Sequence, residues 1–83
     1  MDTMHELVDI MRAARVLAGM SQADLAAAAG LSRQMVVRME NHGGNVTVGV
    51  LATVRSALEK SGVVFIPSTA ARGPGIALKR KGD

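Results

Sequence analysis

Apolar residues recur at spacings of three and four along the first two thirds of the chain, which is the period of an amphipathic α-helix. The first such stretch begins at Glu6, stops near Gly19, and has an expected inward face of Leu7, Ile10, Met11, Ala14, Leu17 and Ala18. Three shorter stretches follow, from Ser21 to Ala29, from Ser32 to roughly Asn41, and from Thr47 to Gly62. The inward face of the last one is Leu51, Val54 and Leu58. The pattern predicts four helices.

Residues at the ends of these stretches support the same division. Ser21, Ser32 and Thr47 are good N-caps, and Asp24 lies three residues after Ser21, as in a capping box. Gly30 is suited to the left-handed conformation that ends a helix. The segment 42–45, His-Gly-Gly-Asn, is a predicted loop.

The pattern changes after Gly62. The run 63–66 (Val-Val-Phe-Ile) is β-branched or aromatic and stops at Pro67, and a stretch punctuated by Gly and Pro leads to a second apolar run at 76–78 (Ile-Ala-Leu). Such runs predict two short strands. The expected fold is mainly α, with four helices and a short C-terminal two-stranded β element, and neither a repeat nor a second domain is visible.

Composition argues against an enzyme and against a metal centre. A chain of 83 residues is one domain with little room for a deep catalytic cleft. It has no Cys, and its two histidines, His5 and His42, lie far apart; His5 and Asp9 share a helix face but lack a third ligand. No nucleophile has a neighbouring base, and no Gly-rich phosphate loop follows a strand. We therefore expect no catalysis, no cofactor and no metal.

Charge and hydropathy indicate the kind of partner. The net charge of +3 and the isoelectric point of about 10.2 favour a polyanion such as nucleic acid. The apolar runs are too short to span a membrane, and the N-terminus lacks a secretory leader pattern. We expect a cytoplasmic protein that does not bind membranes.

The two short helices between Gln22 and Asn41 carry the functional signal. A tight bihelical unit needs a small residue where the helices cross and a permissive turn residue, and Ala26 and Gly30 provide them. The expected shared core is Leu25, Ala29, Leu31, Val36 and Met39, and the outer face of the second helix is Arg33, Gln34, Val37 and Arg38. Long hydrogen-bond donors mixed with a methyl-bearing side chain suit a DNA major groove.

Three runs in this region resemble the phage repressor and Cro family of helix-turn-helix domains, also called the Xre family: 20–26 (MSQADLA), 29–34 (AGLSRQ) and 38–41 (RMEN). The resemblance covers roughly Glu6 to Ser61. It implies a lambda-repressor-like domain at residues 1–61, with the motif at 22–41, whose third helix enters the major groove.

The resemblance also implies roles for particular residues. Arg33, Gln34 and Arg38 are the expected base readers, and Gln22 lies where the family contacts a phosphate. Ser32, as cap of the third helix, and Val37 complete the expected DNA-binding set, because backbone N–H groups at the starts of helices also receive phosphate oxygens. Arg15 and Glu40 match positions where the family ties its first and third helices together by an ion pair, which we expect to be structural.

Residues 62–83 form the predicted dimerisation element. Two strands alone are marginal in water, and pairing with a second chain would cover their exposed edge. The expected dimerisation residues are Val63, Val64, Phe65, Ile66, Ile76 and Leu78. The basic run 79–81 (Lys-Arg-Lys) is equally consistent with a solubilising tail and with a phosphate contact.

The predicted function is a sequence-specific regulator that binds double-stranded DNA, a repressor acting as a homodimer on an inverted-repeat operator. One alternative is an antitoxin that regulates its own operon and binds a cognate toxin through the terminal strands. Another is an adaptor that keeps the fold but has lost DNA binding.

Overall fold

The computed structural model describes residues 3–41 and 46–80. Its elements are α1 (Thr3–Leu17), α2 (Gln22–Ala29), α3 (Arg33–Glu40), α4 (Val48–Lys60), β1 (Val63–Ile66) and β2 (Gly75–Leu78). The prediction of a mainly helical fold with a terminal two-stranded element is confirmed. The predicted loop at 42–45, which includes His42, lies outside the described residues, as do residues 81–83, which include the last residue of the basic run.

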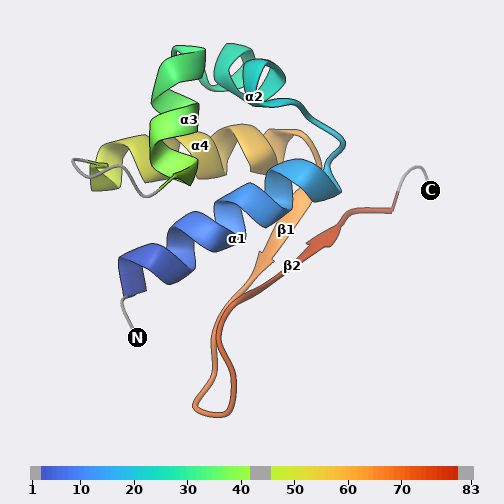
Figure 1. Cartoon of the computed structure of the whole chain (residues 1–83). Helices are drawn as coiled ribbons and strands as arrows, with labels where there is room; N and C mark the ends of the chain where they lie inside the picture. The colour runs from blue at the N-terminus through green and yellow to red at the C-terminus, as the bar shows by residue number, and fades with distance from the viewer. Residues whose placement is uncertain (1–2, 42–45, 81–83) are drawn as a thin grey trace.

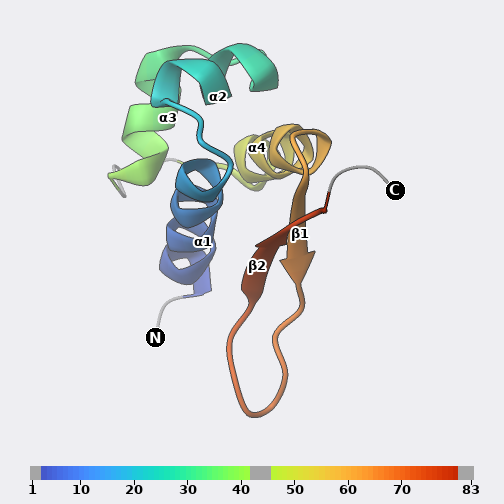
Figure 2. The same cartoon turned by 90° about the vertical axis from the view of Figure 1, so that its right-hand side faces the viewer.

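The α2 and α3 helices and the β hairpin lie at opposite ends of the molecule. Figures 1 and 2 show α2 and α3 at one end, the β hairpin at the other, and α1 and α4 between them. The sheet packs on these two middle helices, β2 against α1 and β1 against α4. The arrangement leaves α2 and α3 at a surface of their own, away from the hairpin.

One core joins the four helices and β1. Its side chains come from α2 and α3 (Leu25, Ala26, Val36, Met39), from α4 (Leu51, Val54, Ala57, Leu58), from α1 (Val8, Met11, Ala14) and from β1 (Val63). The predicted inward face of the fourth helix is confirmed, as is the shared core of the second and third, where Ala29 and Leu31 are partly buried. Burying each large aliphatic side chain contributes about 1.5–3 kcal/mol.

The inward face of α1 differs from the predicted one. The buried residues are Val8, Met11 and Ala14, whereas Leu17 is 43% exposed and its neighbour Val16 is 63% exposed. Residues three or four apart share a helix face, so a stripe centred on Val8 and Met11 excludes Leu17. The prediction that Leu17 faces the core was wrong, and α1 instead carries apolar side chains on its outer side.

The two strands form an antiparallel pair with a defined register. Val63 pairs with Leu78, Val64 with Ala77, Phe65 with Ile76 and Ile66 with Gly75. Because side chains alternate along a strand, Val63 and Phe65 share the inner face with Ile76 and Leu78, while the outer face carries Val64, Ile66 and Ala77. Both faces of this small sheet are therefore apolar.

Within residues 3–41 and 46–80, none of the helices combines the length and the apolar character needed to cross a bilayer.

Candidate nucleic-acid interface

The start of α2 is fixed by the predicted capping box. The Ser21 hydroxyl accepts a hydrogen bond from the Asp24 N–H at 2.9 Å, and the Ser21 N–H donates to the Asp24 carboxylate at 2.9 Å. The hydrogen bond from the Ser21 N–H, and after it the Ser21 hydroxyl, favour the ionised carboxylate and lower the pKa of Asp24. The N-terminus of α2 is thus already supplied with a negative charge by its own chain.

The turn between α2 and α3 depends on Gly30. This residue adopts φ 68° and ψ 30°, a left-handed conformation that a side chain disfavours. It lets the Leu31 N–H reach the Ala26 carbonyl at 2.9 Å, which closes the end of α2. The Ala26 side chain is 4% exposed, as expected for a small residue in the contact between two helices.

The α3 helix has one buried face and one polar face. Val36 and Met39 are fully buried, and Met35 is half-buried. Arg33, Gln34 and Arg38 are exposed on the other side, and Val37 lies half-buried among them. The helix therefore presents three long polar side chains and one methyl-bearing side chain together, as the sequence pattern indicated.

The N-terminus of α3 differs from that of α2 in its charge. Ser32 caps α3 by accepting a hydrogen bond from the Met35 N–H at 3.1 Å. The first turn of α3 contains no acidic residue, whereas that of α2 contains Asp24. Since the positive end of the helix dipole attracts anions, α3 is the better of the two helix starts for a phosphate group.

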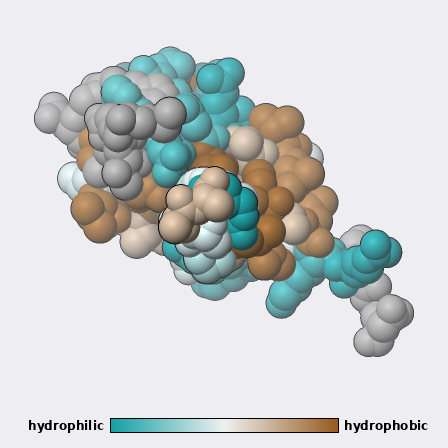
Figure 3. All heavy atoms as spheres, turned by 90° about the horizontal axis from the view of Figure 1, so that it is seen from below, coloured by the Kyte–Doolittle hydropathy of each residue, from teal (hydrophilic) through white to brown (hydrophobic). Residues whose placement is uncertain are grey.

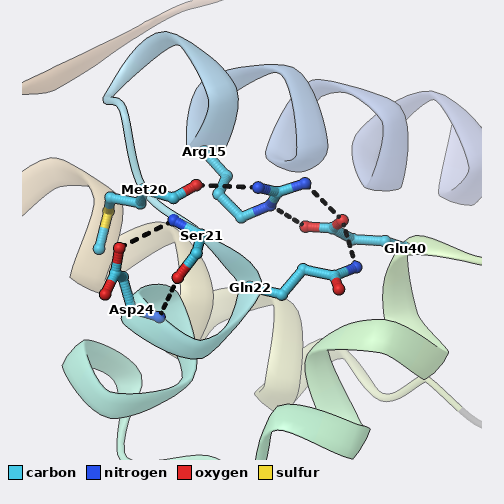
Figure 4. A network of polar contacts seen from close by, with 6 residues as sticks. All are labelled: Arg15, Met20, Ser21, Gln22, Asp24 and Glu40. Carbon is cyan, nitrogen blue, oxygen red and sulfur yellow. Dashed lines mark hydrogen bonds and ion pairs between the residues drawn. The ribbon is translucent and has the colours of Figure 1, made fainter.

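A buried polar network holds the end of α3, which carries the exposed polar face, against α1 (Figure 4). The Arg15 guanidinium binds the Glu40 carboxylate through Nε at 2.7 Å and Nη2 at 3.0 Å, and its Nη1 donates to the Met20 carbonyl at 2.8 Å. Glu40 is 2% exposed and Arg15 14%. The end of α3 is thereby tied to α1 by a two-point ion pair, whose planar geometry restricts orientation as well as distance.

The same network includes a third side chain. Gln22, at the start of α2, donates from Nε2 to the Glu40 carboxylate at 3.1 Å. Within the part of the chain that the structure describes, every buried side-chain nitrogen or oxygen has a hydrogen-bond partner. The polar contacts of α1, α2 and α3 thus meet at one carboxylate.

A family model described as helix-turn-helix matches residues 11–65. The chain belongs to the helix-turn-helix family. This agrees with the resemblance to phage repressor and Cro domains, and it makes the protein a DNA-binding transcription regulator from a family of regulatory domains, not of enzymes. A comparison with curated proteins found no match.

In this helix-turn-helix unit five of the six predicted DNA-binding residues lie together, and the sixth lies on the neighbouring helix. Ser32, Arg33, Gln34, Val37 and Arg38 all lie on α3 or at its start. Gln22 lies on the neighbouring helix, where its half-buried amide contacts Glu40, a bond that sequence reasoning missed. Eighteen residues separate the two positions, and no short-range pattern reports such a pair. An amide nitrogen has two hydrogens, so one remains for the phosphate contact that the resemblance implies.

The predicted dimerisation residues fall into two groups. Val63 is 3% exposed and belongs to the core of its own chain, and Phe65 is half-buried with the Arg55 guanidinium 4.9 Å from its ring centre. The other four retain exposed surface, most of all Leu78 at 45%. Of the six predicted dimerisation residues, Val64, Ile66, Ile76 and Leu78 are thus the ones with side-chain surface left to offer another chain.

Proposed function

We propose that this protein is a sequence-specific repressor that binds an inverted-repeat operator as a homodimer. The observation that carries the proposal is the exposed face of α3, where Arg33, Gln34 and Arg38 lie together on a helix whose other face is fully buried. Surface side chains on a rigid support are suited to reading base edges, because little ordering is needed on binding.

These side chains favour particular bases. An Arg donates two hydrogen bonds to O6 and N7 of guanine, and a Gln pairs with N6 and N7 of adenine, each discriminating by about 1–3 kcal/mol. Val37 offers a methyl contact for the C5-methyl group of thymine. We expect half-sites that contain G and A.

Repression follows from the position of a dimer on its operator. Two copies related by a two-fold axis place their recognition helices in successive major grooves about 34 Å apart, which requires an inverted repeat. Exposed apolar side chains on β2 and on the adjacent end of α1 support a dimer, since Leu78, Val16 and Leu17 are each more than 40% exposed. A dimer bound over a promoter would exclude polymerase.

Selection of bound sites from a random DNA pool tests this function. The purified protein is used at near-physiological salt, because affinity for DNA depends steeply on ionic strength. Enrichment of an inverted repeat with G- and A-containing half-sites is the expected result. Recovery of unrelated sequences with no common site would contradict a sequence-specific regulator, and a single unrepeated half-site would contradict the homodimer.

A further inference from the structure

The outer edge of β2 carries backbone groups with which another strand could form hydrogen bonds. In the part of the chain that the structure describes, the sheet has two strands, so β2 has one edge without a strand partner. Lys79 donates its N–H to the Gly62 carbonyl at 2.8 Å. Alternate residues of an antiparallel ladder direct their backbone groups to the same side, so Ala77 also faces β1, and the backbone groups of Ile76 and Leu78 face the outer edge.

An apolar hollow accompanies this edge. It lies between α1 and β2, and it is lined by the apolar residues Ala13, Val16, Leu17 and Ile76 together with the charged residues Asp9 and Arg12. The sequence of β2, Gly-Ile-Ala-Leu, contains no charged residue or proline of the kind that protects an edge strand from pairing. Hydrophobic side chains also gather at the surface beside the hairpin (Figure 3).

We infer that a second copy of this chain adds its β2 antiparallel to this edge, about a two-fold axis at Ala77. The inference rests on the proposed dimeric function. In this register Ile76 of each copy lies opposite Leu78 of the other, and both residues direct their N–H and C=O groups outward. An axis at Ile76 would instead place Leu78 opposite Pro74, which lacks an N–H.

The same register fills the hollow. Leu78 lies on the inner face of the sheet, with the buried Val63. The Leu78 side chain of the second copy therefore points toward α1, beside Ile76 and into the hollow next to Val16. This contact explains why α1 carries apolar side chains on its outer side.

Charge complementarity supports the antiparallel direction. Arg80 of the second copy lies opposite Pro74, and a hollow next to Pro74 is lined by Glu6 and Asp9 of α1. A parallel pairing would instead bring the basic end of one copy beside the basic end of the other. The acidic start and the basic end of the chain thus meet across the interface, which gives the basic segment a protein contact.

A single cysteine tests the register directly, because the chain has none of its own. In Ala77→Cys the two thiols lie opposite each other at a non-hydrogen-bonded pair, with Cα atoms about 4.5 Å apart, within the range for a disulfide. Mild oxidation of the full chain is expected to give a covalent dimer that still binds the selected operator. In the control Val64→Cys the thiols share the same sheet face but lie three strand spacings apart, about 14 Å, and are expected to stay unlinked.

Sedimentation of the unmodified chain separates the possible failures. If the chain is dimeric but Ala77→Cys links no faster than Val64→Cys, the proposed strand pairing is wrong while the proposed dimer stands. If the chain is monomeric at all concentrations, the proposed dimer fails and this pairing fails with it.

A charge exchange tests the Arg80 contact without DNA. Arg80→Glu is expected to weaken dimerisation about two- to fivefold, the effect of an exposed ion pair, and adding Glu6→Arg is expected to restore it. Failure of the second change to restore dimerisation would overturn this contact.

Discussion

The helix-turn-helix unit and the hairpin differ in how completely one chain buries their apolar side chains. Between α2 and α3 the side chains of Leu25, Val36 and Met39 are fully buried, and the polar surface is left free for a ligand. The hairpin has apolar residues on both faces, and Leu78 remains 45% exposed. The first region is complete within one chain, whereas the second is suited to completion by another.

The largest expected effect comes from breaking the polar network. Glu40→Ala leaves the Arg15 guanidinium without its carboxylate in a nearly buried position, and the cost of such an unpaired charge is about 3–5 kcal/mol. Urea denaturation should show this loss. The double variant Arg15→Met with Glu40→Leu removes both charges and is expected to be much less destabilised; equal losses in the two variants would contradict a role through pairing.

Truncating one leucine in each region tests whether that region is complete within one chain. Leu25→Ala creates a cavity in the core and should cost about 3 kcal/mol in unfolding experiments. Leu78→Ala, at a 45% exposed position, should cost under about 1 kcal/mol at protein concentrations where the chain is monomeric, yet raise the dimer dissociation constant. A large effect of Leu78→Ala on the monomer would show that the hairpin is complete in one chain.

Removal of a helix cap has a smaller effect. Ser32→Ala removes the acceptor for the Met35 N–H and should destabilise the protein by about 1 kcal/mol in thermal unfolding. Ser68→Ala, at an exposed position in the hairpin loop, is the matched control and should leave the unfolding temperature unchanged. Equal shifts in the two variants would argue against the cap.

The smallest expected effect concerns pH. The pKa of Asp24 is lower in the folded chain than in the unfolded chain, because the Ser21 N–H and hydroxyl favour the carboxylate. Its stabilising contribution is therefore present above the unfolded pKa and is lost as pH falls through the folded value. Asp24→Asn should lack this part of the acid dependence when unfolding is followed across acidic pH; an unchanged profile would contradict it.

Local signals explain what the sequence predicted well. The caps at Ser21, Ser32 and Thr47 and the turn at Gly30 depend on residues within three or four positions, and each appears in the structure as expected. The two strands follow from the apolar run that starts at Val63. Such features are encoded over distances that a sequence pattern spans.

Tertiary packing explains what the sequence did not predict. Leu17 fits a helical repeat but faces outward, because the face of α1 that packs against the core is the one that contains Val8. The pattern of the strands, apolar at nearly every position, did not reveal that Val63 faces the core while Val64 faces solvent. The bond from Gln22 to Glu40 joins two helices at a distance that periodicity does not report. Each of these features depends on which segments meet in space.

Paired titrations of the selected operator and of an unrelated duplex test the central claim, that the exposed face of α3 reads base sequence. Arg33→Ala is expected to weaken operator binding by tenfold or more, in line with about 1–3 kcal/mol for a bidentate base contact, while binding to the unrelated duplex changes little. Lys60→Ala, an exposed basic residue at the end of α4, is the charge-matched control and should alter neither. Equal losses on both duplexes from Arg33→Ala would show that this side chain contacts phosphates alone and would contradict the account.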